Sequence, residues 1–215
     1  VDVRKALEYA AEDADITFRL YKILKGNLNR EKLTNIYEIF EKPLIKILAN
    51  MEIEGIKVDD KFLNILSKKF EKKIKDLEKK IFKISKKEFN IASTKQLGEI
   101  MYNELKISTL KKTKKGSFAT SASVLEDLAF KGNELPKLVL EWRQISKLKN
   151  TYSDSLQEHI NPNTKRVHTS FLLAATTTGR LASSDPNLQN IPIKTEDGKE
   201  IRKSFVAEKG KKLIS

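Results

Sequence analysis

Cysteine is absent from the 215 residues of the chain, which excludes disulfide bonds, thiolate chemistry and cysteine-ligated zinc. Histidine occurs only twice, and His159 and His168 lie too far apart in sequence for a local zinc motif. No stretch approaches the ~20 apolar residues that a membrane span needs, and the charged start of the chain predicts no signal peptide. We therefore expect a cytoplasmic protein that has no membrane as a partner.

The motifs of two common enzyme classes are missing as well. Gly198 and Lys199 lack both the upstream glycine and the following Ser or Thr of a phosphate-binding loop. No arrangement of Ser, His and Asp suggests nucleophilic catalysis. Neither class is therefore indicated.

The charge, in contrast, is strongly one-sided. The chain has 42 basic and 29 acidic residues, a net charge of +13, and nearly all of the excess is lysine. Such a field attracts polyanions, as in nucleic-acid-binding proteins. A solvated surface in a lysine-biased sequence explains the same numbers, so both interpretations stay open on charge alone.

Apolar residues recur at spacings of three or four over most of the first 160 residues, which predicts helices. The clearest case is 60–88, where one apolar stripe runs along a helix whose other faces are mostly lysine. We expect this helix to pair with an antiparallel neighbour. Further helices are predicted over 3–25, 31–51 (broken or bent near Pro43), 94–104, 121–130 and 134–157.

The pattern changes after Asn161 and Pro162. β-branched and aromatic residues predict strands, separated by segments rich in turn-forming residues. The predicted strands cover 56–58, 167–173, 201–207 and 213–215. The expected fold class is mainly α with a small β-containing C-terminal part (α+β).

The most informative segment lies between the predicted strands. Residues 176–192 read TTTGRLASSDPNLQNIP, a nearly uncharged loop with one arginine, three side-chain amides and several hydroxyls. Guanidinium and amide groups are the donors that contact bases and sugars, although most such clusters are ordinary turns.

This loop, with RVHTSF at 166–171 and GKEIRKSFVA at 198–207, resembles the start of the palm in family A DNA polymerases. The resemblance continues upstream in the same order. The long helix between thumb and palm is similar to 135–152, the thumb tip to 92–105, and the last helix of the 3′–5′ exonuclease domain to 9–24.

The resemblance implies three domains: an exonuclease-like helix over 1–30, a helical thumb over 31–160 and the beginning of the palm over 161–215. It implies a monomeric parent enzyme that extends primer–template DNA with dNTP and Mg²⁺ in replication and repair. Because the chain starts at Val1 and stops before the catalytic aspartates of the palm, we expect a fragment that does not polymerise alone.

The resemblance also assigns roles to residues of the 176–192 loop. Arg180 is expected to reach the minor groove near the primer terminus, and Asn187, Gln189 and Asn190 to line the duplex. Minor-groove acceptors occur on every base pair, so donors placed there sense pair shape without sequence. The alternative for Asn187 and Asn190 is a pair of residues that cap the loop.

Phosphate contacts are expected from the thumb. Arg143 and Lys147 share a helix face and match positions that meet the DNA backbone, with solvated charge as the alternative. Ser93, Thr94 and Lys95 match the thumb-tip residues that meet phosphates, and capping of the helix start is compatible with that role. The basic loop with Lys112 and Lys115 is expected to clamp the minor-groove edge of the duplex, with a solvated loop as the alternative.

One metal candidate remains. Tyr9 and Asp13 match the Tyr-x-x-x-Asp pair of the exonuclease domain, in which the aspartate binds metal. The other carboxylates that a divalent cation needs are expected upstream of Val1, so exonuclease activity is not expected here.

Two alternatives to the polymerase segment stay open: a stand-alone, non-enzymatic DNA-binding module, and a helical scaffold with incidental lysines. The polymerase assignment depends on an accessible Arg180. It would fail if the guanidinium lay inside a closed core.

Overall fold

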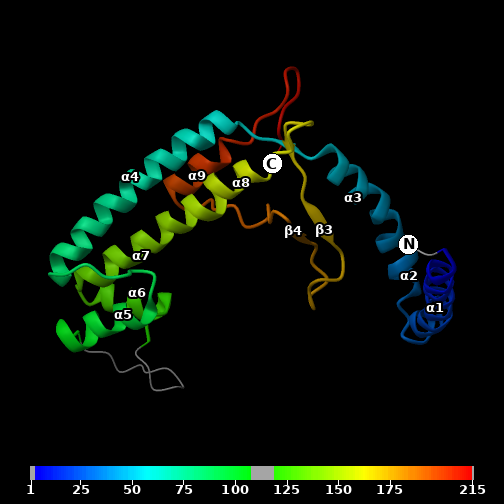
Figure 1. Ribbon diagram of the computed structural model, residues 1–215, viewed down its shortest axis with the longest axis horizontal. Helices are drawn as coiled ribbons and strands as arrows, with labels where there is room; N and C mark the ends of the chain where they lie inside the picture. The colour runs from blue at the N-terminus through cyan, green and yellow to red at the C-terminus, as the bar shows by residue number, and fades with distance from the viewer. Residues whose placement is uncertain (1–2, 108–118, 215) are drawn as a thin grey trace. The chain divides into compact units, whose positions relative to one another are not determined.

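The computed structural model of the protein describes residues 3–107 and 119–214 (Figure 1). The chain divides into two compact units, and each is described by itself. Unit 1 comprises Val1–Glu54 and Phe171–Ala182, and unit 2 comprises Gly55–Ser170 and Ser183–Ser215. The exonuclease-like helix, thumb and palm predicted with limits at residues 30 and 160 are not the same as these compact units. Those domain limits therefore stay a prediction.

Unit 1 is built from helices. Two long α-helices are joined by a short α-helix and a π-helical stretch: α1 (Val3–Arg30), α2 (Thr34–Ile36), η1 (Tyr37–Glu41) and α3 (Lys42–Glu54). Gly26 does not end the first helix, which continues to Arg30. Among the described side chains of this unit, only Leu48 is buried.

Pro43 explains the irregular stretch before α3. Proline has no backbone N–H and cannot supply the hydrogen bond to the residue four positions earlier. In the structure the wider π-helical turn of η1 ends at Glu41, two residues before Pro43. The predicted break is therefore a change of helical register, and the helix continues through it.

Unit 2 contains the rest of the helices. They are α4 (Asp60–Ser85), α5 (Thr94–Gly98), η2 (Glu99–Glu104), α6 (Ala122–Phe130), α7 (Glu134–Lys147), η3 (Leu148–Asp154), α8 (Ser155–Glu158) and α9 (Glu196–Arg202). The predicted helices at 60–88, 94–104, 121–130 and 134–157 are confirmed, with shifts of a few residues at their ends.

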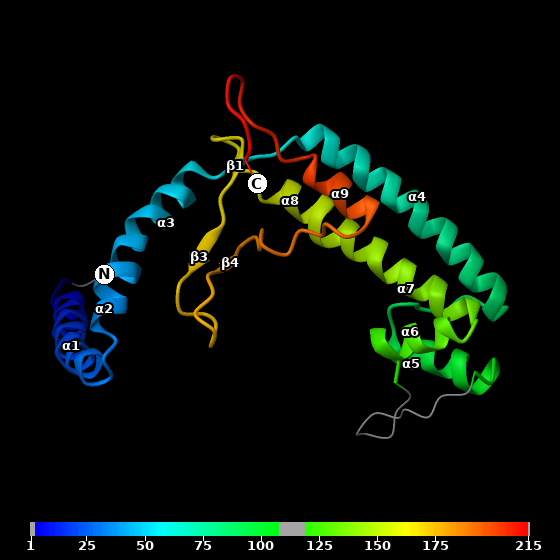
Figure 2. The ribbon, with the colours of Figure 1, turned by 180° about the vertical axis from the view of Figure 1, so that it is seen from behind.

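The core of unit 2 lies where α4 packs against α7. The two helices run side by side in opposite directions (Figures 1 and 2). From α4, Leu63, Phe70 and Ile81 are fully buried in this core. The only tryptophan, Trp142 of α7, donates from Nε1 to Glu78 of α4 at 3.1 Å. The predicted antiparallel pairing is thus confirmed.

Short strands join distant parts of the chain. The strands β1 (Ile56–Lys57) and β2 (Arg166–Val167) pair antiparallel, with Ile56 opposite Val167. Gly55, at a φ of +62°, precedes this pair, and a side chain there would meet His168 at 2.6 Å. A second pair joins β3 (Ser170–Leu172) and β4 (Ala182–Ser184).

The strand predicted over 201–207 is wrong at its start, because its first two residues end the helix α9, and of its later residues Phe205 forms an isolated antiparallel bridge with Val58. Thr195 caps this helix by accepting a hydrogen bond from the Gly198 N–H at 3.2 Å, and two acidic residues occupy its first turn. These local signals favour a helix start more strongly than the β-branched residues favour a strand. Residues 213–214 do not form the predicted strand either.

The fold class is nevertheless as expected, since the described chain is mainly α-helical with few, short strands. Within residues 3–107 and 119–214, no helix combines the length and apolar character that crossing a membrane requires.

Candidate nucleic-acid interface

The second part of the 176–192 segment, from Ser183 to Asn190, is called the palm loop below. It is fixed at its start by buried hydroxyl groups. Thr169 Oγ1 lies 2.7 Å from Ser183 Oγ and 2.8 Å from the Pro186 carbonyl oxygen. Ser183 Oγ also accepts a hydrogen bond from the Leu188 N–H at 3.1 Å. Because both hydroxyls are buried, these bonds are costly to break.

The end of the loop is fixed by a second buried hydroxyl. Tyr152, in η3, donates a hydrogen bond to the backbone carbonyl of Asn190. The Tyr152 ring is 3% exposed, and burial raises the pKa of its hydroxyl above the ordinary value. Leu188 and Ile191 pack against the core from within and beside the loop.

The three amide side chains predicted to line the duplex, those of Asn187, Gln189 and Asn190, are exposed. Asn187 also shapes the loop, because its Oδ1 accepts a hydrogen bond from the Gln189 N–H at 3.0 Å. The capping alternative therefore describes the oxygen of Asn187 correctly. That bond leaves its amide nitrogen available to donate, so capping and DNA contact remain compatible.

Arg180 lies in the part of the motif that belongs to unit 1. Its side chain is exposed, and Thr176 Oγ1 donates to its backbone carbonyl at 2.9 Å. Gly179, at a φ of +71°, shapes the turn before it. The guanidinium is thus outside any closed core, and the condition that would have ended the polymerase assignment is not met.

The two cations predicted on α7 differ in their surroundings. Arg143 is half-buried and donates from Nη1 to the Thr120 carbonyl at 2.6 Å, and burial lowers the pKa of its guanidinium. Arg143 therefore holds the 119–120 segment against α7. Lys147, one turn further, is exposed. No local sequence pattern indicates the Arg143 contact, which spans 23 residues.

The predicted thumb tip starts with a capped turn. Ser93 Oγ accepts a hydrogen bond from the Gln96 N–H at 3.3 Å, which confirms the cap. Thr94 and Lys95 are exposed in the first turn of α5. Sequence reasoning missed Gln96, whose Oε1 accepts from the Asn90 N–H at 2.8 Å. The spacing of Ser93 and Gln96 is that of a capping box, but here the Gln96 side chain binds the Asn90 N–H and not the Ser93 N–H that a capping box would use.

Lys112 and Lys115 lie outside the described residues. Tyr9 and Asp13 are both exposed on α1, with Tyr9 70% exposed. In the described part of the chain, no three His, Asp or Glu side chains come together in a way that could hold a metal ion. Asp13 alone offers too few oxygen ligands for a hard divalent cation.

Residues 60–215 match the sequence pattern that defines DNA polymerase family A. The chain belongs to this family. Curated relatives match it from end to end. DNA polymerase I of Rhizobium leguminosarum is 51% identical over the whole chain, which covers 21% of that protein. DNA polymerase I of Pseudomonas aeruginosa is 45% identical over the whole chain, which covers 24% of that protein.

A solved structure has the same fold. The POL domain of Pol1 from M. smegmatis, in complex with DNA primer-template and dNTP, superposes with a TM-score of 0.84 at 36% identity. The match covers 90% of this chain and 34% of that one. The chain spans about a fifth to a quarter of the length of the two DNA polymerase I relatives named above.

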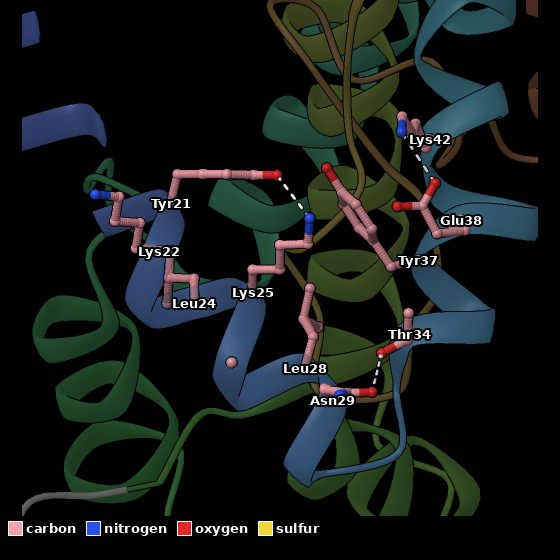
Figure 3. Close-up of a pocket in the computed structure, with 11 residues that line it drawn as sticks. Tyr21, Lys22, Leu24, Lys25, Leu28, Asn29, Thr34, Tyr37, Glu38 and Lys42 are labelled. Carbon is pink, nitrogen blue, oxygen red and sulfur yellow. Dashed lines mark hydrogen bonds and ion pairs between the residues drawn. The ribbon is translucent and has the colours of Figure 1, made fainter. Parts of the chain in front are cut away.

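Unit 1 also contains a pocket of about 770 Å³ between the C-terminal half of α1 and the segment formed by α2 and η1 (Figure 3). Three lysines line it, and two of them pair with other lining residues: Lys25 donates to the Tyr21 hydroxyl at 3.0 Å, and Lys42 to Glu38 at 2.9 Å. The Tyr21 hydrogen bond raises the pKa of Lys25. The pocket holds none of the residues that the family resemblance singles out.

Proposed function

We propose that this chain is part of a DNA-directed DNA polymerase acting in DNA replication and repair, and that it holds the primer–template duplex. One observation carries the proposal: the segment that matches the family presents exposed amides on a loop fixed at both ends by buried hydroxyls. A rigid frame lowers the entropy cost of placing donors against a duplex.

The palm loop and Arg180 would contact the minor groove. Asn187, Gln189 and Asn190 supply amide donors, and Arg180 a charged donor, for acceptors that every base pair presents. Such contacts favour a correctly shaped pair in any sequence, which template copying requires.

The thumb would contact the phosphates. Lys147 and Lys95 are exposed cations, and Ser93 and Thr94 stand at the start of α5 with backbone N–H groups nearby. Arg143 uses one N–H for Thr120, and its guanidinium has further donors for a phosphate. On the basis of sequence, Lys112 and Lys115 are proposed to clamp the minor-groove edge of the duplex.

For the whole protein we propose template-directed nucleotidyl transfer with dNTP as substrate and Mg²⁺ as metal ion. The monomeric state, the cytoplasmic location and the division into exonuclease-like helix, thumb and palm belong to the same proposal. The stand-alone binding module is not favoured, because the chain matches polymerases over its whole length.

Single substitutions test the minor-groove contact. Asn190→Ala removes the side-chain amide and leaves the backbone carbonyl that Tyr152 binds. We expect primer–template affinity, measured by fluorescence anisotropy, to fall about two- to tenfold, as for one lost hydrogen bond. For Arg180→Ala a charged donor is lost, and a fall of about ten- to a hundredfold is expected.

Two controls make the test specific. Asn163→Ala removes an exposed amide from the turn after α8 and should bind like the unchanged chain. Lys147→Ala should flatten the dependence of log affinity on log salt by about 0.9, whereas Asn190→Ala should not change that slope. Unchanged binding by both Asn190→Ala and Arg180→Ala would overturn the proposed role of the loop.

A further inference from the structure

A row of exposed lysines follows the long helix of unit 2. We name it the lysine ridge, and it consists of Lys61, Lys68, Lys72, Lys75, Lys79 and Lys83 of α4. From Lys68 onward the spacings of four, three, four and four residues keep the side chains on one face. At 1.5 Å per residue the ridge is about 33 Å long.

The ridge lies opposite the face that α4 buries. At 100° per residue, the buried row of Leu63, Phe70 and Ile81 points about half a turn away from the lysines. That buried face packs against α7 (Figures 1 and 2). The ridge is therefore a different surface from the α7 face that carries Arg143 and Lys147.

Two of the three lysines of α4 that lie off the ridge, Lys69 and Lys73, are paired with acids of α9, whereas Lys80 is exposed. Lys73 pairs with Asp197 of α9 at 2.6 Å, and Lys69 lies 3.9 Å from Glu200 of the same helix. These two lysines hold α9 against α4. Their charges are therefore paired with acidic side chains of unit 2.

On the ridge, five lysines make no ion pair with any residue that the structure describes: Lys61, Lys68, Lys72, Lys79 and Lys83. Lys75 pairs with Glu71 at 2.7 Å, and a shallow hollow of about 400 Å³ is lined by Lys68, Lys72, Lys75 and Lys79 together with Glu71 and Asp76. The two acids flank the row, so the ridge itself carries one sign of charge.

The charge and spacing of the ridge lysines indicate which class of ligand the ridge can bind. Cations about 4.5–6 Å apart in a line suit a polyanion with regularly repeated charges. An interfacial membrane helix needs an exposed apolar face, and that of α4 is buried. Sites for single-stranded nucleic acid add aromatic rings for base stacking, and the ridge positions include none.

We propose that the lysine ridge binds the phosphate backbone of double-stranded nucleic acid. The site is separate from the thumb and palm contacts proposed above and does not depend on them. A duplex on this face meets the outer side of α4, so the ridge would hold a second stretch of duplex beside the primer–template end.

The test uses the 215-residue chain and a labelled blunt duplex of about 30 base pairs, roughly three helical turns. The ridge variant combines Lys68→Gln, Lys72→Gln and Lys79→Gln, which removes three charges without breaking an ion pair. We expect its affinity at low salt to fall about tenfold or more, and its salt slope to flatten by about two to three.

The matched control variant removes three charges elsewhere, through Lys131→Gln, Lys137→Gln and Lys209→Gln, all at exposed positions. Far-ultraviolet circular dichroism confirms that both variants are folded. Equal effects of the two variants would overturn the inference, because net charge alone would then explain binding. Loss of binding to a polyglutamate probe, with duplex binding retained, would overturn it in favour of an acidic protein partner.

The two proposals fail separately. If Asn190→Ala weakens primer–template binding and the ridge variant does not alter blunt-duplex binding beyond its control, only the ridge inference is lost. If the ridge variant alone has an effect, the palm-loop role is lost and the ridge remains. If both hold, their effects on a long primer–template duplex should add, as expected for distant sites.

Discussion

Helices α1 and α4 are nearly equal in length, at 28 and 26 residues, and both carry an apolar stripe, yet the structure buries only one of them. In α4, Leu63 and Phe70 are 0% exposed. In α1, Leu7, Phe18 and Ile23 are each more than half exposed. The periodicity of a sequence thus predicts a helix and its apolar face, but it does not predict what covers that face.

The difference has an energetic consequence. Unit 2 gains its stability from a shared core to which its helices from α4 to α9 and the strand β2 contribute buried side chains. Unit 1 has little buried apolar surface, so α1 depends mainly on its own backbone hydrogen bonds, which are marginal for an isolated helix in water.

The largest effect that tests this comparison comes from a matched pair of phenylalanines. Phe70→Ala empties a fully buried site in unit 2 and should lower the free energy of unfolding by about 3–5 kcal/mol. Phe18→Ala, at a site 56% exposed, should cost less than about 1 kcal/mol. Urea unfolding followed by Trp142 fluorescence and by circular dichroism measures both. Equal losses would show that α1 is buried in solution.

A smaller effect depends on pH. Burial tends to raise the pKa of Asp154, but hydrogen bonds from Lys149 at 2.6 Å and Ser67 at 2.6 Å outweigh it and hold the pKa below its ordinary 3.8. Asp154→Asn should destabilise unit 2 by about 1–2 kcal/mol at neutral pH.

The sign of the pH dependence follows from the lowered pKa. The carboxylate stabilises the folded state above about pH 4, and this contribution is lost as the pH falls through the folded-state pKa. The gap between the unchanged chain and Asp154→Asn should therefore be constant from pH 7 to about pH 5 and narrow below about pH 4. A gap that widens in acid would contradict the role assigned to Asp154.

The start of α4 gives a further, still smaller test. Asp59 Oδ1 accepts a hydrogen bond from the Phe62 N–H at 2.9 Å and caps the helix. Asp59→Ala should cost about 1 kcal/mol, whereas Asp59→Asn, which keeps the acceptor, should cost much less. If both substitutions cost the same, charge at the helix start matters and the hydrogen bond does not.

The smallest effect belongs to unit 1. Glu38 raises the pKa of Lys42 through their hydrogen bond, and both side chains are exposed. Glu38→Gln should lower the pKa of Lys42, measurable by NMR titration, and leave the unfolding curve unchanged because exposed ion pairs contribute little to stability. A clear loss of stability would mean that unit 1 is tighter than its exposure indicates.

Local signals explain which parts of the fold were predictable. The stripe from Leu63 to Ile81 predicted α4 well, but its end was placed three residues late, because Lys86 adopts the left-handed turn that glycine usually signals. The β-branched residues near the end of α9 favour a strand, whereas the cap at Thr195 and the acidic first turn are the local signals for the helix.

The candidate site shows the same division. The Ser93 cap follows from residue type and spacing and was predictable. The contact of Arg143 with Thr120, and that of Tyr152 with Asn190, join segments that only the folded chain brings together. The DNA-contact roles rest on family resemblance, because the amides of the palm loop carry no periodicity that distinguishes them from an ordinary turn.

The hydroxyls that fix the palm loop have one more consequence. Thr169 and Ser183 do not ionise in water at any ordinary acidity, and burial moves the deprotonation of Tyr152 further into the alkaline range. The backbone conformation of the loop around Asn187 and Asn190 is therefore stabilised by uncharged groups. Acidification that weakens ion pairs such as that of Lys149 with Asp154 should leave the geometry of this loop intact.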